Sequence, residues 1–162
     1  FGVEPSKLTE HVDAAMFCLC KGLAAPLGAM LVGTEAFVTE ARRVRQRLGG
    51  GMRQAGFMAA TGIVALETMI PRLAEDHAKA QKIVDSLRAV HADLVVPSSG
   101  RTNIVKLDFA SVVKDARDIA QSLKKEALLV KPLSDKYCRM ITHLDVSMED
   151  VDHLVRAIKN RL

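Results

Sequence analysis

Lys21 is the first residue in this chain whose setting could support chemistry. It follows a short apolar run and begins a loop that is rich in glycine and proline, and no acidic residue lies between Asp13 and Glu35. Apolar surroundings favour the uncharged amine of a lysine, which can attack a carbonyl carbon and form a Schiff base. Most lysines are solvated surface charges, so the local sequence leaves both interpretations open.

Two arginines lie where an anion could bind. Arg53 follows the three glycines of residues 49–51. A bare glycine turn can approach an anion while the arginine binds phosphate with two hydrogen bonds, although the same glycines could simply end one helix before the next. Arg139 lies in the strand-like, apolar stretch 137–143, where an unpaired buried charge is costly. A substrate carboxylate, a structural acid or an outward-facing position would each satisfy it.

Other polar clusters are more typical of structure. The arginines of residues 42–47 interleave with no aromatic residue, so we interpret them as the solvated face of a helix and predict no nucleic-acid partner. Cys18 and Cys20 would lie on the same side of a strand as core thiols. With Cys138 they form neither an even disulfide set nor a four-ligand zinc set, so we predict no metal site and a reducing compartment.

Composition is that of an ordinary globular chain. Of its 162 residues, 49% are hydrophobic and 26% charged, and the formal net charge is +4, which suits anionic partners in general. No apolar stretch approaches the roughly 18 residues of a membrane span, so no membrane partner is expected. We predict a cytoplasmic protein, and any targeting segment would lie upstream of Phe1.

Hydrophobic patterning predicts the following elements. Residues 12–21 and 29–33 are strand candidates whose apolar faces nothing in the chain would cover, and Thr34 is a plausible N-cap for a helix to residue 48. Apolar residues at helical spacing extend from 54 to 90, and Pro71 should kink or split that helix.

The last third of the sequence predicts a small α+β unit. Strands are expected at 93–96, 102–109, 128–130 and 138–142, with a helix over 112–123 and a final helix capped by Ser147 and Asp150. The predicted order is β-β-α-β-β-α. Residues 1–55 then look like the last strands of a larger sheet, 56–91 like linking helices, and 92–162 like a small C-terminal domain.

Five stretches, taken together, resemble the threonine aldolases, a family of fold-type-I enzymes that use pyridoxal 5'-phosphate (PLP). They are CKGLAAPLGA at 20–29, LGGGMRQAG at 48–56, RLAEDH at 72–77, TN at 102–103 and RMITHLDVS at 139–147. They occur in the family's order and spacing across almost all of the chain. The resemblance predicts an α/β fold-type-I fragment: the end of the large PLP-domain sheet, linking helices and a small α+β domain.

The resemblance also implies roles. Lys21 would form the Schiff base with PLP, Arg53 would bind the cofactor phosphate, Cys20 would lie beside the cofactor, and Arg139 would bind the substrate's α-carboxylate. The expected activity is an aldehyde-lyase that cleaves L-threonine or L-allo-threonine, which are small β-hydroxy amino acids, to glycine and acetaldehyde. A homodimer or homotetramer is expected for the full-length protein.

Two departures from the family pattern keep alternatives open. Cys20 stands where the family usually has serine, and a thiol is a poorer hydrogen-bond donor. In the family, the acidic partner of the pyridine nitrogen and the ring-stacking residue lie upstream of the point where this sequence starts. The alternatives are a truncated, non-catalytic protein or interaction module, and another fold-type-I PLP lyase such as a β-eliminating enzyme.

The 162-residue chain by itself should bind PLP weakly and have no useful aldolase activity. One bond between a carbonyl and Lys21 is a weak and reversible imine when the pyridine nitrogen and phosphate have no partners. The measurement is the absorbance spectrum of the purified chain mixed with PLP. An absorbance band typical of a lysine-bound cofactor that disappears in Lys21→Ala would contradict the prediction.

Overall fold

The computed structural model describes residues 2–162 and divides into two compact units. The first unit extends to Leu73, and the second is Ala74–Leu162. Helix α3, Gly56–Arg88, contributes its first half to one unit and its second half to the other. The three-part division expected from the sequence stays a prediction.

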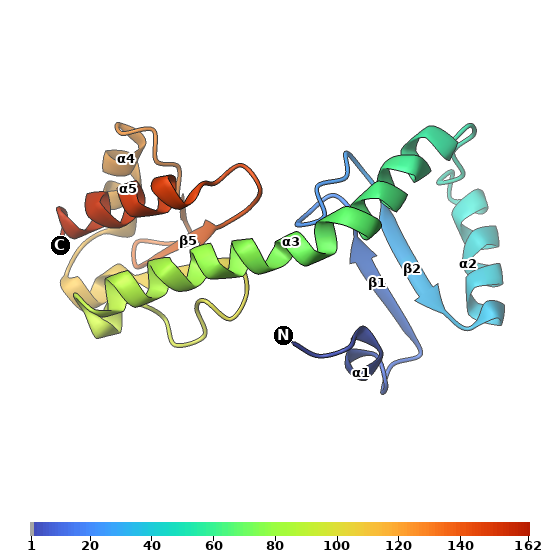
Figure 1. Ribbon diagram of the computed structural model, residues 1–162, viewed down its shortest axis with the longest axis horizontal. Coiled ribbons are helices and arrows are strands. Elements are labelled where there is room, and N and C mark those ends of the chain that lie inside the picture. The colour runs from blue at the N-terminus through green and yellow to red at the C-terminus, as the bar shows by residue number, and fades with distance from the viewer. Residues whose placement is uncertain (1) are drawn as a thin grey trace. The chain divides into compact units, whose positions relative to one another are not determined.

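The first unit holds a two-stranded antiparallel sheet and three helical segments. Its elements before α3 are α1 (Pro5–Leu8), β1 (Ala14–Cys18), β2 (Ala29–Gly33) and α2 (Glu35–Arg47). Strands β1 and β2 pair with Met16 opposite Leu31, and Figure 1 shows them as neighbouring arrows followed by α2. Both expected strands are therefore present, and the first is shorter than the predicted range 12–21.

The β1–β2 sheet leaves apolar side chains open to solvent. Every residue of β2 is exposed, and Met16 on β1 is 63% exposed. A two-stranded sheet is only marginally stable without something packed on its faces. The expectation of uncovered strands in this region is confirmed.

Helix α2 is formed by local signals that the sequence contains. The Thr34 hydroxyl accepts a hydrogen bond from the Phe37 amide at 3.3 Å, as an N-cap should. On the exposed face, Glu40 forms ion pairs with Arg43 at 3.2 Å and Arg47 at 3.1 Å. These arginines therefore lie on a solvated helix face, as interpreted from their spacing.

Helix α3 runs through Pro71 without interruption, so of the two expected effects of Pro71 the split does not occur, and the kink stays a prediction. Proline at this position removes the hydrogen bond that an amide would donate to the Glu67 carbonyl. Because Pro71 is exposed, water can reach that part of the helix, and the loss is small enough for packing on both sides to outweigh it.

Helix α3 is also more apolar than the sequence pattern predicted. An 18-residue window within its 33 residues has a mean hydropathy of 1.3, and 11% of that window is buried. By length and composition alone the helix could cross a membrane, so the expectation that no stretch qualifies is wrong for α3. Its exposed apolar side chains, such as Phe57 and Ile63, are equally typical of a helix that packs against other protein.

The second unit is a three-stranded antiparallel sheet with helices packed on it. After α3 come η1 (Ala92–Leu94), β3 (Ile104–Asp108), η2 (Phe109–Val112), α4 (Ala116–Lys124), β4 (Lys131–Pro132), β5 (Tyr137–Ile141) and α5 (Met148–Lys159). The strand order is β3-β5-β4.

Two expected strands, at 93–96 and 128–130, do not form. Residues 93–96 contain the end of a 3-10 turn and a single bridge from Val95 to Leu107, and 128–130 precede the short strand β4 instead of forming one.

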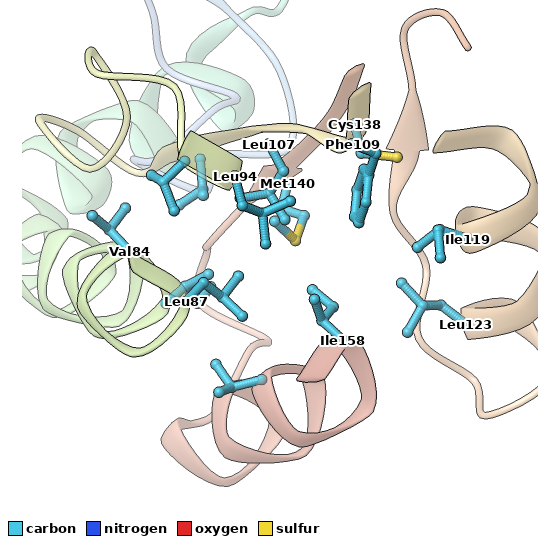
Figure 2. Packing of buried hydrophobic residues seen from close by; sticks show 14 of the residues in the cluster. Val84, Leu87, Leu94, Leu107, Phe109, Ile119, Leu123, Cys138, Met140 and Ile158 are labelled. Atoms are coloured by element: carbon cyan, nitrogen blue, oxygen red, sulfur yellow. The ribbon is translucent and has the colours of Figure 1, made fainter. Parts of the chain in front are cut away.

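The core of the second unit lies between one face of this sheet and helices α3, α4 and α5. Figure 2 shows side chains from the three helices and from the sheet meeting there, among them Leu87, Leu107, Leu123 and Ile158, each at most 1% exposed. Alternation along β3 buries Val105 and Leu107 and leaves Ile104 and Lys106 outside the core, as the sequence predicts.

Helix α5 begins with the predicted capping box. The Ser147 hydroxyl accepts a bond from the Asp150 amide at 3.0 Å, and the Ser147 amide donates to the Asp150 carboxylate at 2.8 Å. The hydrogen bonds from the side chain and backbone of Ser147 hold the pKa of Asp150 below its usual value. The helix start is therefore set by two residues that are neighbours in sequence.

Leu107→Ala should destabilise the second unit by about 2–5 kcal/mol, because it removes a fully buried side chain and leaves a cavity. Leu129→Ala is the matched control, since Leu129 is 80% exposed and its loss should change stability by less than about 0.5 kcal/mol. Urea unfolding of the two variants measures both values, and equal losses would contradict the assigned core.

Candidate functional site

The loop that carries Lys21 is closed by its own backbone. The Leu19 amide donates to the Gly28 carbonyl at 3.0 Å, and the Ala25 amide donates to the Leu19 carbonyl at 3.0 Å. Within the loop the Ala24 amide bonds the Lys21 carbonyl at 2.9 Å, and Ala24 adopts a φ of 55°. The loop therefore has a defined turn with Lys21 at its first position.

Apolar packing anchors this loop on α3. Leu19, Leu23 and Ala25 are buried in one cluster with Ala65, and Leu66, Met69 and Leu73 pack against it. A Cβ at Gly22 would lie 2.7 Å from a Leu73 methyl group, so a larger residue here would require the Leu73 side chain to shift. The residue that directly follows Lys21 therefore packs closely against α3.

Lys21 and Cys20 lie between the buried anchors and are themselves exposed. Across residues 2–162 the structure gives the Lys21 amine no ion pair and no side-chain hydrogen bond, so the amine is available to a ligand. Cys20 is exposed and not in a strand, which corrects the interpretation of it as a core thiol.

The third cysteine does behave as a core thiol. Burial, followed by the charge of Asp115, raises the pKa of Cys138 to about 11, and its thiol donates to the Ala116 carbonyl at 3.3 Å. Within the described part of the chain, no group of three or more His, Cys, Asp or Glu side chains could hold a metal ion.

The glycines before Arg53 end a helix. The Gly49 amide donates to the Gln46 carbonyl at 3.1 Å and the Gly50 amide to the Arg45 carbonyl at 2.8 Å, while Gly49 has a φ of 77°. This is the Schellman pattern, which caps the C-terminus of α2. Arg53 then lies exposed in the following turn, with no ion pair to any residue in 2–162.

Arg139 lies at the middle of β5, in the second unit. It is half-buried, and its Nε is buried without a hydrogen-bond partner among the described residues. Its strand neighbours Cys138 and Met140 face the core, so Arg139 points to the opposite face of the sheet. Of the interpretations left open, an outward-facing strand position agrees with this placement, and a carboxylate ligand remains compatible with it.

A hydrogen-bonded clasp fixes the end of β5 to α3. The Thr142 hydroxyl, in a residue only 2% exposed, donates to the Asp76 carbonyl at 2.6 Å, and the Asn103 side chain donates to the Thr142 carbonyl at 2.9 Å. Lys79 lies 3.6 Å from the Asp76 carboxylate and 3.4 Å from the His143 carbonyl. Asp76, Asn103 and Thr142 come from three of the stretches that support the resemblance.

The sequence pattern did not predict the clasp. The stretches RLAEDH, TN and RMITHLDVS contain polar residues to which no role was assigned, and only the folded unit brings three of them into hydrogen-bonding contact.

A cavity of the second unit adjoins the clasp. It has a volume of about 420 Å³ and is lined by residues of β5, α5 and the 127–130 segment, including Met140, Thr142 and Leu154. None of Lys21, Cys20, Arg53 and Arg139 lines it. The first three belong to one unit and Arg139 to the other, and the predicted roles of all four residues stay predictions.

Comparison with known proteins gives the chain a context. The beta-eliminating lyase family matches residues 1–110. The chain is 35% identical over 151 residues to the low specificity L-threonine aldolase of Escherichia coli strain K12, covering 93% of this chain and 43% of that protein. It is 34% identical over 155 residues to an Arabidopsis thaliana protein assigned as low-specificity L-threonine aldolase 2, covering 95% of this chain and 44% of the relative.

The matched region is the C-terminal part of these relatives, and the chain spans less than half of their length. Among solved structures, an Exiguobacterium protein assigned as an aromatic amino acid beta-eliminating lyase/threonine aldolase superposes with a TM-score of 0.71 at 19% identity. That superposition covers 97% of this chain and 47% of that one. The structural neighbours are fold-type-I PLP enzymes, so the predicted fold class is confirmed.

Thr142→Val should destabilise the second unit by about 0.5–1.5 kcal/mol, because it removes the hydrogen bond from the buried Thr142 hydroxyl to the Asp76 carbonyl while conserving shape. Thr102→Val is the control: its hydroxyl accepts a single long bond, 3.4 Å from the Ile104 amide, and the change should cost less than about 0.5 kcal/mol. Urea unfolding compares the two, and a loss in Thr102→Val as large as in Thr142→Val would contradict the role of the clasp.

Proposed function

Because the chain belongs to the beta-eliminating lyase family, we propose that it forms the lysine-bearing part of a PLP-dependent aldehyde-lyase of the threonine aldolase type. The substrate would be L-threonine or L-allo-threonine and the products glycine and acetaldehyde. The observation that carries the proposal is the identity to threonine aldolases over more than nine-tenths of the chain. The anchored Lys21 loop supports it further, because an exposed amine on a fixed backbone suits a covalent role.

The residues present fit such a cofactor in chemistry. The exposed amine of Lys21 matches an aldehyde, and the exposed guanidinium of Arg53 matches a phosphate. When bound, PLP supplies an electron sink for the carbanion that forms when a bond at the substrate's Cα breaks. In the proposed site Arg53 binds the phosphate and Cys20 lies beside the cofactor, where its thiol would make a weaker contact than a serine hydroxyl.

Each residue of the chain would have a separate task in the reaction. Lys21 would hold the cofactor through its amine. Arg139 would bind the α-carboxylate, and fixing that group decides which bond at Cα is oriented for cleavage. The Thr142 clasp, three residues further along, would keep the end of β5 in place while this happens.

One other function has an observation in its favour. The matched family is described as beta-eliminating lyases, and such an enzyme would release pyruvate from serine instead of an aldehyde from threonine. A third outcome, a non-catalytic chain or interaction module, would appear as the absence of both activities.

The test uses the complete protein that includes this chain. There, Lys21→Ala should lower aldolase activity by roughly 10³-fold or more, since it removes the amine that would bond to the cofactor. The assay follows glycine and acetaldehyde from L-threonine beside pyruvate from L-serine. Lys7→Ala, which alters the other lysine of the first unit, is the control and should retain activity.

Borohydride reduction in the presence of PLP, followed by peptide mapping, locates the reacting amine in the same protein. A reduced adduct at Lys21 is expected. An adduct elsewhere, or pyruvate from serine without aldehyde from threonine, would overturn the proposed site or the proposed reaction respectively.

A further inference from the structure

Three basic residues form a row across the sheet of the second unit. On the central strand β5, Arg139 lies directly opposite Lys106 of β3 and directly opposite Lys131 of β4. Residues directly opposite in antiparallel strands project from the same face. Lys131, Arg139 and Lys106, here called the cation row, therefore lie side by side on one face.

That face is the one away from the core. The residues that alternate with the row, Leu107, Cys138 and Met140, are buried against the helices, as Figure 2 shows. The helices α3, α4 and α5 all contribute to the cluster on that buried side. Lys131, at the edge of the opposite face, is exposed, so a small anion could reach the row from that edge.

Nothing in the described chain neutralises the row. Across residues 2–162, no carboxylate lies within ion-pair distance of Lys106, Lys131 or Arg139. The acidic residue on the same face of β3, Asp108, instead accepts a hydrogen bond from the Ala110 amide at 3.0 Å. Like charges placed directly opposite each other destabilise a sheet, so the row is unfavourable unless something compensates it.

Each member of the row is held differently. The Lys106 ammonium lies 4.0 Å from the centroid of the Tyr137 ring, which fixes it by a cation–π contact. Arg139 is half-buried, and its Nε lacks a partner. Lys131 is exposed and can move its ammonium toward an anion bound at Arg139. The arrangement combines one oriented guanidinium, one fixed charge and one mobile charge.

We propose that the cation row is a carboxylate-binding site in which Lys131 closes on the anion held by Arg139, while Lys106 adds its fixed positive charge from the other side. The inference rests on the proposed function only in taking the ligand to be a carboxylate. It adds two residues, Lys131 and Lys106, to which the sequence assigned no role. Of these two, Lys131 is expected to contact the anion directly beside Arg139.

Edge protection is the other reason for a lysine at this position. Strand β4 is short, lies at the edge of the sheet and consists of Lys131 and Pro132, both typical of edges that resist pairing. Edge protection does not require the lysine to lie opposite Arg139. If it were the only role of Lys131, Lys131→Gln would change aggregation without changing the affinity for an anion. Measuring aggregation and anion affinity therefore separates the two roles.

The test is an acetate titration of the 162-residue chain, with sodium chloride keeping the ionic strength constant and acetamide as the uncharged analogue. Amide chemical shifts at 106, 131 and 139 report binding. We expect Lys131→Gln to raise the acetate dissociation constant roughly threefold and Arg139→Gln roughly tenfold. Lys114→Gln, which changes an exposed lysine outside the sheet, is the control and should leave it unchanged.

A second measurement tests whether Lys131 and its neighbours in the row repel each other when no anion is bound. At low ionic strength without acetate, Lys131→Gln should raise the urea midpoint of unfolding, because it removes a like-charge contact. An unchanged acetate affinity in Lys131→Gln together with a weakened one in Arg139→Gln would overturn the inference and leave the role of Arg139 in the proposed function intact. Unchanged affinity in both variants would remove Arg139 as well, whereas the assignment of Lys21 depends on the borohydride experiment alone.

Discussion

The burial of apolar side chains along α3 is the interaction on which the rest of this structure depends. In its first half, Ala65, Leu66 and Leu73 hold the loop that carries Lys21. In its second half, Ala80 and Leu87 form part of the core beneath the three-stranded sheet. A helix of this length is stable in water mainly through such packing, because propensity alone contributes little. The backbone positions of Lys21 and Arg139 each follow from contacts that this one helix makes.

The two units satisfy their apolar residues to very different degrees. The second unit buries a continuous cluster that includes residues of three helices and two strands, and three of its buried polar residues, Asp76, Lys79 and Thr142, take part in the clasp. The first unit buries four residues in its cluster and leaves the apolar side chains of β2 exposed. Segments with few buried contacts open at lower free energy than a well-packed core. The Lys21 loop is thus part of the less stable unit, although its own turn is well defined.

Strand β5 shows how one element serves both stability and chemistry. Its inward residues, Cys138 and Met140, are buried in the core, and its outward residue Arg139 is left with a positive neighbour on each side. Alternation along a strand makes this possible, because side chains on the two faces are independent of each other. A row of like charges lowers the stability of the sheet, and a bound anion would reverse that cost. Binding and stability are therefore linked at this position.

Local signals in the sequence determined the elements whose causes are local. Thr34 at the start of α2, the Ser147–Asp150 capping box and the alternation of Val105 and Leu107 with polar neighbours all appear in the structure as the pattern predicts. The order and spacing of the five matching stretches likewise identified the fold class, which the structural neighbours confirm.

Tertiary structure decided what depends on partners far away in the chain. Val95 makes a single bridge to Leu107 instead of extending a strand, and Pro71 is accommodated within α3, because packing on either side outweighs a local preference. The register that brings Lys106 and Lys131 beside Arg139 is another such outcome. Periodicity states which residues share a face, but the pairing of strands is set by how the whole core fills, and that information is not contained in any one segment.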